Sequence, residues 1–548
     1  MTARQSGGDV PLPIYLEIDA AMRAGDSPTA IALARRALSE GLRHPVLFSL
    51  RAYAFETQGL YERAVADLDA ALGMTPGDPK LLVELGRCLL GAGDFPRAIQ
   101  VSEAAIAGAP GSAAAQYNLG CAQEFMGELD AAWPAYAKAS EIDPSLVDAT
   151  ARLAGLAARR GDHAEAHALA DKVLRRDPNN TLARLALALA DVAQKDFIAA
   201  ETQARAVLNT PGTPPQQRAS AMGQLGDALD GQGRTEEAFS LYTQANGLLR
   251  TMFRQRFAGP GMEPGRQIAV RLAHEFAAVA PEQWRATPPA PRDNDALGLA
   301  FIVGFPRSGT TLLAQILGSH PSVVTVEERP VLHESITRYS LRMDGLGDLA
   351  AISAETMARQ RGYFWANLRA RGIPTAGRMI VDQTPLNTIQ LPIIAKLFPE
   401  ARIIFAVRDP RDVVLSCFRR MFAPNAYVYE FLTLNGSAHF YDEVMRLDRL
   451  YRAGLEQERL DIRNEDLIAD FEARTRALCA FVGLEWNESM LNFSRRAKAR
   501  RIATPSALQL RDGIRSDGVG HWRAYAEQLS PVLPVLDRWV AAFGYGDR

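Results

Sequence analysis

Residues 299–317 read LAFIVGFPRSGTTLLAQIL, an apolar run that leads through a short polar turn into a second apolar segment. The first run has the length and composition of a buried strand, and the second is typical of a buried helix. Gly304 and Gly309 keep the Gly-x4-Gly spacing of a loop whose backbone N–H groups face a phosphate-sized anion at a helix N-terminus. The stretch therefore predicts a strand, an anion-binding turn and a helix, the beginning of a P-loop-like α/β domain.

The cation of this loop is not where a nucleoside-triphosphatase places it. In such loops a lysine follows the second glycine and reaches the β- and γ-phosphates, and the next Ser or Thr holds magnesium. Here Thr310 occupies the lysine position, and Arg307 stands three residues before it. The sequence thus disfavours a nucleotide kinase and favours an anion site made of arginine, hydroxyl and backbone N–H groups.

A second polar segment follows another apolar run. Residues 402–420 read RIIFAVRDPRDVVLSCFRR, which predicts a strand that ends near Arg408 and a helix capped by Asp409. Ser416 lies eight residues after Arg408, and a planar guanidinium beside a hydroxyl group suits a phosphate. The run RMIVD at 378–382 predicts a further strand. Because strands alternate with helical stretches, we expect a parallel sheet covered by helices on both faces.

The two polar segments together resemble the donor site of sulfotransferases that use 3′-phosphoadenosine 5′-phosphosulfate (PAPS). PRSGTT resembles their 5′-phosphosulfate loop, and the pair Arg408 and Ser416 resembles their 3′-phosphate site. Four further blocks stand in the order of that family: HPSVVTVEE (320–328), VDQTPLN (381–387), FVGLEW (481–486) and TPSALQLRDGIRSDGVGHWR (504–523). The resemblance covers residues 299–545 and is closest to the tetratricopeptide-sulfotransferase proteins, and more remote to the tyrosylprotein sulfotransferases.

The resemblance implies a role for individual residues. Glu328 aligns with the general base, while Arg307 and Gln383 would face the leaving oxygen; without the resemblance, Glu327 is an equal candidate for the base. The residues implied to bind PAPS, or its product adenosine 3′,5′-bisphosphate (PAP), are Arg307, Ser308, Gly309, Thr310, Thr311, Arg408, Ser416, Arg420 and Ser506. No metal is expected, because the loop histidines lack a second ligand at metal-binding spacing.

Three positions depart from the family pattern. Gln383 stands where lysine is usual, Asn464 where tyrosine is common, and His521 where Lys or Arg precedes a tryptophan. Glutamine can still donate a hydrogen bond, but it supplies no charge. The stretch 495–523 carries eight Arg and Lys residues against Asp512 and Asp517, which would complement an anionic donor.

The first half of the chain repeats with a period of 34 residues. Three slots keep this period: Gly25, Gly59, Gly93, Gly127 and Gly161, with Lys195 next; Ala30, Ala64, Ala98, Ala132, Ala166 and Ala200; and Pro76, Pro110, Pro144 and Pro178. The pattern resembles the tetratricopeptide repeat, a helix–turn–helix unit with small residues at these offsets. We therefore expect an α-solenoid of about seven units over residues 10–250. It is either a spacer or dimerisation arm or, as we favour, a groove for a protein or peptide partner.

A junction separates the repeats from the α/β part. Within residues 251–297, Gly259-Pro260-Gly261 and the Pro-rich stretch 287–295 stand on either side of one helix predicted over 265–279. The expected organisation is a solenoid over 10–250, a linker over 251–297 and a sulfotransferase domain over 298–548.

Composition limits the classes of protein to which this chain of 548 residues can belong. The net charge of −2 gives no footprint for nucleic acid, four isolated cysteines suit a reducing compartment, and no apolar run could span a membrane. We expect a cytoplasmic enzyme that transfers a sulfuryl group from PAPS to a hydroxyl or amine acceptor, possibly on a protein. The alternative is a scaffold that binds nucleotide, turns over poorly and docks a partner through its repeats.

Overall fold

The structure is a computed structural model that describes residues 12–285, 296–493 and 518–546. The chain divides into two compact units, Met1–Ala190 and Asp191–Arg548. The first unit consists of repeat helices. The second contains the last repeat helices together with the α/β domain.

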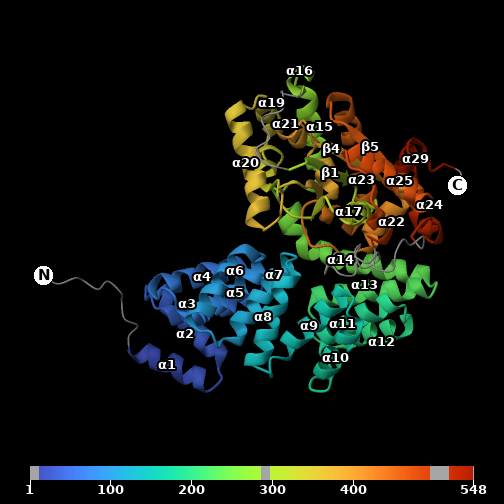
Figure 1. Cartoon of the computed structure of the whole chain (residues 1–548). Coiled ribbons are helices and arrows are strands. Elements are labelled where there is room, and N and C mark those ends of the chain that lie inside the picture. Colours follow the sequence, from blue (N-terminus) through green and yellow to red (C-terminus); the bar gives the residue numbers. More distant parts are fainter. Residues whose placement is uncertain (1–11, 286–295, 494–517, 547–548) are drawn as a thin grey trace. The chain divides into compact units, whose positions relative to one another are not determined.

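The predicted solenoid is confirmed as a series of helices, most of them 12 to 14 residues long. Their bounds are α1 (Leu12–Arg23), α2 (Ser27–Ser39), α3 (Pro45–Glu56), α4 (Tyr61–Met74), α5 (Pro79–Ala92), α6 (Phe95–Gly108), α7 (Ala113–Phe125), α8 (Leu129–Ile142), α9 (Val147–Arg160), α10 (His163–Leu174), α11 (Thr181–Gln194), α12 (Phe197–Asn209), α13 (Pro215–Gly231) and α14 (Thr235–Ala258). Figure 1 shows them in succession along the N-terminal half.

The periodic glycine ends the first helix of each unit in a left-handed conformation. From Gly25 to Gly161 the five glycines of this slot have φ between 72° and 78°, a region that other residues rarely adopt. Lys195 takes the same conformation with φ 64°. The slot therefore repeats because the chain must reverse direction at the same point of each unit.

The other small-residue slots lie where the two helices of a unit cross. The periodic alanines from Ala30 to Ala200 are fully buried. A Cβ atom added at Gly120 would lie 2.7 Å from the Tyr136 ring, and one added at Gly226 would lie 2.5 Å from the Tyr242 ring. The helices thus approach so closely that these positions tolerate no larger side chain.

The α/β domain contains a five-stranded sheet in the order β2-β3-β1-β4-β5, with every neighbouring pair parallel. The strands are β1 (Gly298–Gly304), β2 (Val323–Glu327), β3 (Met379–Gln383), β4 (Arg402–Val407) and β5 (Arg459–Arg463). The strands predicted from the apolar runs are confirmed as β1, β3 and β4. The edge strand β5 was not predicted, because its sequence, RLDIR, alternates charged and apolar residues and contains no continuous apolar run.

Helices cover both faces of the sheet (Figure 1). They are α15 (Gly265–Ala278), α16 (Pro281–Trp284), α17 (Thr310–Gly318), α18 (His333–Tyr339), α19 (Gly345–Ala350), α20 (Ala354–Ala370), α21 (Leu391–Leu397), α22 (Pro410–Arg419), α23 (Leu434–Gly454), α24 (Asn464–Ala469), α25 (Phe471–Val482), α28 (Ala526–Leu529) and α29 (Leu533–Ala542). Ala300 and Ile302 of β1 pack with α17 and α25, while Phe301 and Val303 join the core on the opposite face. The helix predicted over 265–279 is α15, and its Leu272 and Phe276 are part of that second core.

The strand order places a topological switch point at the end of β1. Its neighbours β3 and β4 lie on either side, so the chain leaves β1 in one direction across the sheet and later returns in the other. In open parallel sheets ligands bind beyond the carboxyl ends of the strands at such a switch point. The loop between β1 and α17 lies there.

Replacement of Gly120 by alanine tests the steric origin of the repeat. The new methyl group would meet the Tyr136 ring, which is buried and donates a hydrogen bond to Glu124 Oε2 at 2.7 Å, so the ring cannot turn away. We expect Gly120→Ala to lower the free energy of unfolding by about 1–3 kcal/mol in denaturant titration. The control Gly155→Ala, in α9 with nothing within 4 Å of the new Cβ, should be neutral or stabilising. Equal effects of the two changes would contradict the steric explanation.

Candidate functional site

The loop between β1 and α17 has an unusual backbone. Gly304, Arg307 and Gly309 all have positive φ, at 151°, 71° and 101°. A Cβ atom at Gly304 would lie 2.7 Å from the Ala406 carbonyl oxygen, so the loop begins directly against β4. Non-glycine residues with positive φ are rare and cluster at functional sites, which makes Arg307 a candidate for a constrained binding group.

Thr388 fixes the start of this loop. Its hydroxyl donates to the Gly304 carbonyl oxygen at 2.7 Å and accepts from the Gly304 N–H at 2.9 Å. Thr388 is fully buried, and it ends the short 3-10 helix η1 (Pro385–Thr388) that follows β3. No sequence motif marks Thr388, although it stands next to the VDQTPLN block.

The predicted donor-site residues of the loop and of the β4–α22 segment lie together. Arg307 Nε donates to Ser416 Oγ at 3.0 Å, and Arg408 Nη1 donates to the Arg307 carbonyl oxygen at 3.2 Å. As predicted, Asp409 caps α22, where its carboxylate accepts the Arg411 N–H at 2.9 Å. The strand end and the helix thereby bring Arg408 and Ser416 to the loop.

Positive charge accumulates at this point. Burial, followed by the nearby charges of Arg420 and Arg408, lowers the pKa of Arg307 to about 9. Ser308 Oγ and Arg408 Nε are buried and have no hydrogen-bond partner among residues 12–285, 296–493 and 518–546. Buried polar atoms without partners and clustered cations both fit an anionic ligand such as a phosphate.

Arg411 is not part of this cluster. Its guanidinium donates to both carboxylate oxygens of Asp409 at 2.9 and 2.7 Å and lies 3.9 Å from the centre of the Trp522 ring. A basic residue at a helix N-terminus points to an anion only when no carboxylate already neutralises it, and here Asp409 does.

The remaining hydroxyl groups of the loop begin α17. Thr310 and Thr311 form its first turn and are buried, and Gln383 Nε2 at the end of β3 donates to Thr310 Oγ1 at 3.2 Å. The Gln383 carbonyl oxygen accepts the Glu328 N–H at 2.8 Å. These contacts place Gln383 between the loop and the acidic pair that follows β2.

The two acidic residues after β2 differ in environment. Glu327 accepts hydrogen bonds from Gln315 at 2.8 Å and Thr325 at 3.0 Å. Glu328 has φ 48°, and desolvation raises its pKa, as does the charge of Glu327, while Arg307 opposes the shift. Glu328 is exposed, so an acceptor can reach it, whereas the Glu327 carboxylate is held by two hydrogen bonds. A reachable carboxylate with a raised pKa near a cation cluster suits a general base, which favours Glu328 over Glu327.

The other two departures from the family pattern, Asn464 and His521, also have defined neighbours. A Cβ atom at Gly309 would lie 2.7 Å from Asn464 Oδ1, so the side chain at 464 packs directly on the loop. His521 Nε2 lies 3.3 Å from Asp230 Oδ1 of α13. The third, Gln383, is almost completely buried.

Arg420 follows the last residue of α22. Its Nη1 atom lies 2.8 Å from Asp227 Oδ2 of α13, and its charge acts on Arg307 as described above. No sequence pattern points to this carboxylate, because Asp227 belongs to the last repeat. Ser506 and most of the basic stretch 495–523 lie outside the described residues.

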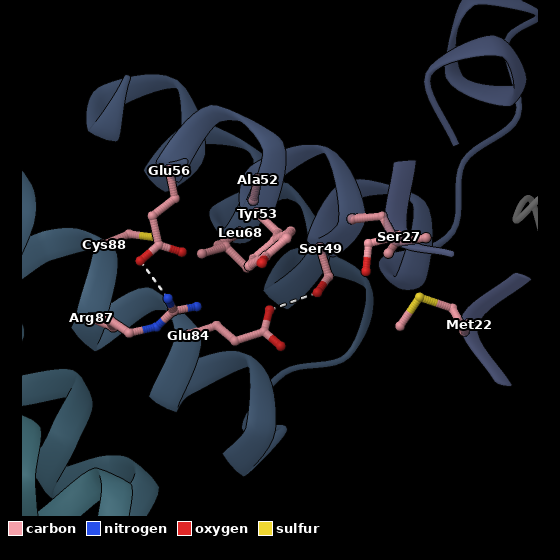
Figure 2. Close-up of a pocket in the computed structure, with 11 residues that line it drawn as sticks. Met22, Ser27, Ser49, Ala52, Tyr53, Glu56, Leu68, Glu84, Arg87 and Cys88 are labelled. Atoms are coloured by element: carbon pink, nitrogen blue, oxygen red, sulfur yellow. Dashed lines mark hydrogen bonds and ion pairs between the residues drawn. The ribbon is translucent and has the colours of Figure 1, made fainter. Parts of the chain in front are cut away.

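The N-terminal repeats contain a cavity of about 210 Å³, which is lined mainly by α3 and α5. Figure 2 shows Glu56 facing Arg87 and Ser49 facing Glu84 across it. Ser49 Oγ donates to Glu84 Oε2 at 2.6 Å, and the Tyr53 side chain at its edge is exposed. The cavity has the size of a single side chain and an acidic lining.

Fold and site together define an α/β domain with an anion-binding loop at the switch point of its sheet. Comparison with known families specifies the class: residues 300–488 match the sulfotransferase family, and residues 15–79, 49–113, 83–147 and 117–181 match the tetratricopeptide repeat. The chain thus joins tetratricopeptide repeats to a domain of the sulfotransferase family, which confirms the resemblance predicted from the motifs.

Three proteins of similar sequence match this chain at 25 to 27% identity. An uncharacterized protein of Aquifex aeolicus (strain VF5) is 25% identical over 356 residues, covering 63% of this chain and 45% of the relative. Protein-tyrosine sulfotransferase 1 of Danio rerio is 27% identical over 216 residues, covering 36% and 57%. Protein-tyrosine sulfotransferase 2 of Gallus gallus is 26% identical over 267 residues, covering 45% and 65%. The chain spans about half the length of the first two relatives.

Within 12–285, 296–493 and 518–546 no helix is both long and apolar enough to cross a membrane. No group of three or more His, Cys, Asp or Glu side chains in the same ranges could hold a metal ion.

Asp382, next to Gln383, provides a test of the electrostatics of β3. Burial raises its pKa to about 7, although Asn387 Nδ2 donates to its Oδ1 at 2.9 Å. In the unfolded chain the carboxyl ionises near pH 4, so between about pH 4 and 7 the folded state binds the extra proton and loses stability as pH rises. We expect this loss to reach up to about 4 kcal/mol and Asp382→Asn to remove it in urea titrations across that range. Parallel pH profiles for the two proteins would contradict the assignment.

Proposed function

We propose that the protein is a sulfotransferase that moves a sulfuryl group from PAPS to a hydroxyl or amine acceptor and releases PAP. One observation supports the proposal. Arg307, Arg408 and Ser416 are joined by hydrogen bonds at a loop whose glycines have positive φ, and the charge of Arg420 acts on Arg307. Their charges and the two buried atoms without partners suit the 5′- and 3′-phosphate groups of one nucleotide. The sulfotransferase match of residues 300–488 agrees with this chemistry.

In the proposed reaction the sulfur–oxygen bond to the bridging phosphate oxygen breaks, and a bond forms between sulfur and the acceptor oxygen or nitrogen. Glu328 takes the acceptor proton on its carboxylate. Arg307 and the loop N–H groups stabilise the charge that remains on the bridging oxygen. Gln383 donates a neutral hydrogen bond there in place of the family's lysine, and Thr310, which it contacts, belongs to the same group of donors.

The donor would be held by residues from three segments. We propose Arg307, Ser308, Gly309, Thr310 and Thr311 for the 5′ side, Arg408, Ser416 and Arg420 for the 3′-phosphate, and Ser506 as a further contact. We also propose the functional division into repeats over 10–250, a connecting segment over 251–297 and a catalytic domain over 298–548.

Ligand-induced stabilisation tests donor binding. PAP should raise the melting temperature by mass action, by the equivalent of about 2.7 kcal/mol at a hundredfold excess over its Kd, and ATP should do much less. Arg408→Ala should abolish most of this shift because it leaves the 3′-phosphate without its guanidinium. The matched control is Arg411→Ala at the same helix end, where Asp409 and Trp522 already occupy the guanidinium. Arg411→Ala should lower the melting temperature of the protein without ligand but keep the increase that PAP causes.

Two results would contradict this prediction. An equal response to ATP and PAP, in the presence or absence of magnesium, would contradict a PAPS site and favour the kinase interpretation. Loss of the shift in both arginine variants would show only a damaged helix start and would leave Arg408 without a specific role in binding.

The acidic pair after β2 gives a second test. We expect Glu328→Gln to lower the single-turnover rate about 10²- to 10⁴-fold, the usual contribution of a general base. The wild-type rate should rise with pH through a midpoint above the ordinary range of a glutamate pKa, because the carboxylate form is required. Glu327→Gln should keep the maximal rate and move this midpoint to lower pH, since it removes the charge that raises the pKa of Glu328. Loss of turnover in Glu327→Gln alone would reverse the assignment.

For the repeats we propose a protein or peptide partner, which is also a source of the acceptor. The cavity beside Glu56 and Glu84 suits a positively charged side chain, and the exposed Tyr53 provides an apolar edge. The names of the relatives make a tyrosine hydroxyl group the first acceptor to test. Firm PAP binding without transfer to any acceptor would instead favour the weakly active scaffold.

A further inference from the structure

The last repeat helices and the end of α22 are joined by a cluster of charged groups. Asp227 and Asp230 project from α13, and Arg419 and Arg420 lie at the end of α22. Arg420 Nη1 lies 2.8 Å from Asp227 Oδ2, and Arg419 Nη2 lies 2.6 Å from Asp230 Oδ2. Arg419 Nη2 also lies 3.5 Å from Asp227 Oδ1, so Asp227 contacts both consecutive arginines and Asp230 contacts Arg419.

Both aspartates are fixed by a tyrosine as well. Tyr242 of α14 donates to the other oxygen of Asp227 at 2.9 Å, and Tyr525 donates to Asp230 Oδ1. The Asp227 carboxylate thus has a bonded partner on each oxygen, and only about 15% of its side chain is exposed. An ion pair in such a setting has a defined geometry, unlike most pairs on a surface.

Neutral contacts hold the same helices in place. Asn246 Nδ2 of α14 donates to the Phe418 carbonyl oxygen at 2.8 Å, and the rings of Phe239 and Phe418 lie 5.2 Å apart. A Cβ atom at Gly223 would lie 3.3 Å from Met421 Sδ. The last repeat is therefore packed against the α22 end independently of the ion pairs.

Arg420 would be the least restrained member of the cation cluster without this contact. About 30% of its side chain is exposed. By contrast, the Arg307 guanidinium donates to Ser416 of α22, and the Arg408 guanidinium donates to the Arg307 carbonyl oxygen of the loop. Like charges at short range repel, so a long exposed side chain would turn toward water. Asp227 offsets the repulsion, and the other two nitrogens of Arg420 donate to no residue in the described part of the chain.

We infer that Asp227 is a positioning residue of the donor site: it holds one edge of the Arg420 guanidinium so that the other edge meets the 3′-phosphate of a nucleoside 3′,5′-bisphosphate. This inference rests on the proposed function. It makes the final repeat part of the donor site, although all the residues that would touch the nucleotide belong to the α/β domain.

The test measures PAP affinity of the full chain by isothermal titration calorimetry. We expect Asp227→Asn to weaken binding about tenfold and Asp227→Glu to stay close to wild type, because the longer carboxylate can still reach Arg420. Glu237→Gln is the matched control: it removes an acidic group of α14 that pairs with Arg234 at the surface. It should leave the affinity unchanged.

A double-mutant cycle separates positioning from general damage. In an Arg420→Ala background, Asp227→Asn should have no further effect on PAP affinity, since the side chain that it positions is gone. A purely structural role would weaken binding by the same factor in both backgrounds. Tyr242→Phe is a milder variant that keeps the ion pair and frees one oxygen of Asp227. It should weaken binding about threefold, again only when Arg420 is present.

The outcomes distinguish this inference from the proposed function. If wild-type protein does not bind PAP, the proposed function fails. If wild type binds and Asp227→Asn binds equally well or more tightly, the carboxylate competes with the phosphate instead of positioning Arg420, and only this inference is overturned. If Asp227→Asn does not fold, an unchanged affinity in Tyr242→Phe overturns it.

Discussion

Like-charged arginines at the end of β1 impose the main constraint on the α/β domain. Arg307 is half-buried in a loop of positive φ, and desolvation together with the charges of Arg420 and Arg408 lowers its pKa to about 9. The elements around them supply compensating groups: Ser416 from α22, backbone carbonyl oxygens of the loop, and Asp227 from the last repeat. The arrangement is costly without an anion and becomes favourable with one, which is the behaviour expected of a binding site and not of a structural turn.

The departures from the family pattern make sense within this charge distribution. A lysine at 383 would add a further cation to a site that already crowds three arginines, whereas glutamine bonds Thr310 without charge. His521 lies beside Asp230, so its change belongs to the contact with the last repeat. Asn464 packs on Gly309, where a Cβ atom would already be too close, and its short side chain leaves the loop in place.

Close packing is the corresponding constraint in the repeats. Buried alanines allow the helices to cross, glycines allow aromatic rings such as Tyr136 to lie on the helix backbone, and left-handed residues end the first helix of each unit. In the last unit a small residue, Gly226, has a second role. Gly226 accommodates Tyr242, which in turn orients Asp227 toward Arg420. The same repeat geometry therefore serves the solenoid and supports the neighbouring site.

The sequence by itself determined the repeats, the three central strands, the anion-binding loop and the Asp409 cap. These features depend on short-range rules: a fixed period, apolar runs, glycine spacing and local capping. Only the tertiary structure decided which charges meet. It separated Arg411, whose charge Asp409 neutralises, from Arg408. It also gave Glu327 two hydrogen-bond donors and left Glu328 exposed within reach of the charge of Arg307. It also brought Asp227 to Arg420 across 193 positions, since a contact between distant residues depends on how helices pack and leaves no local pattern in the chain.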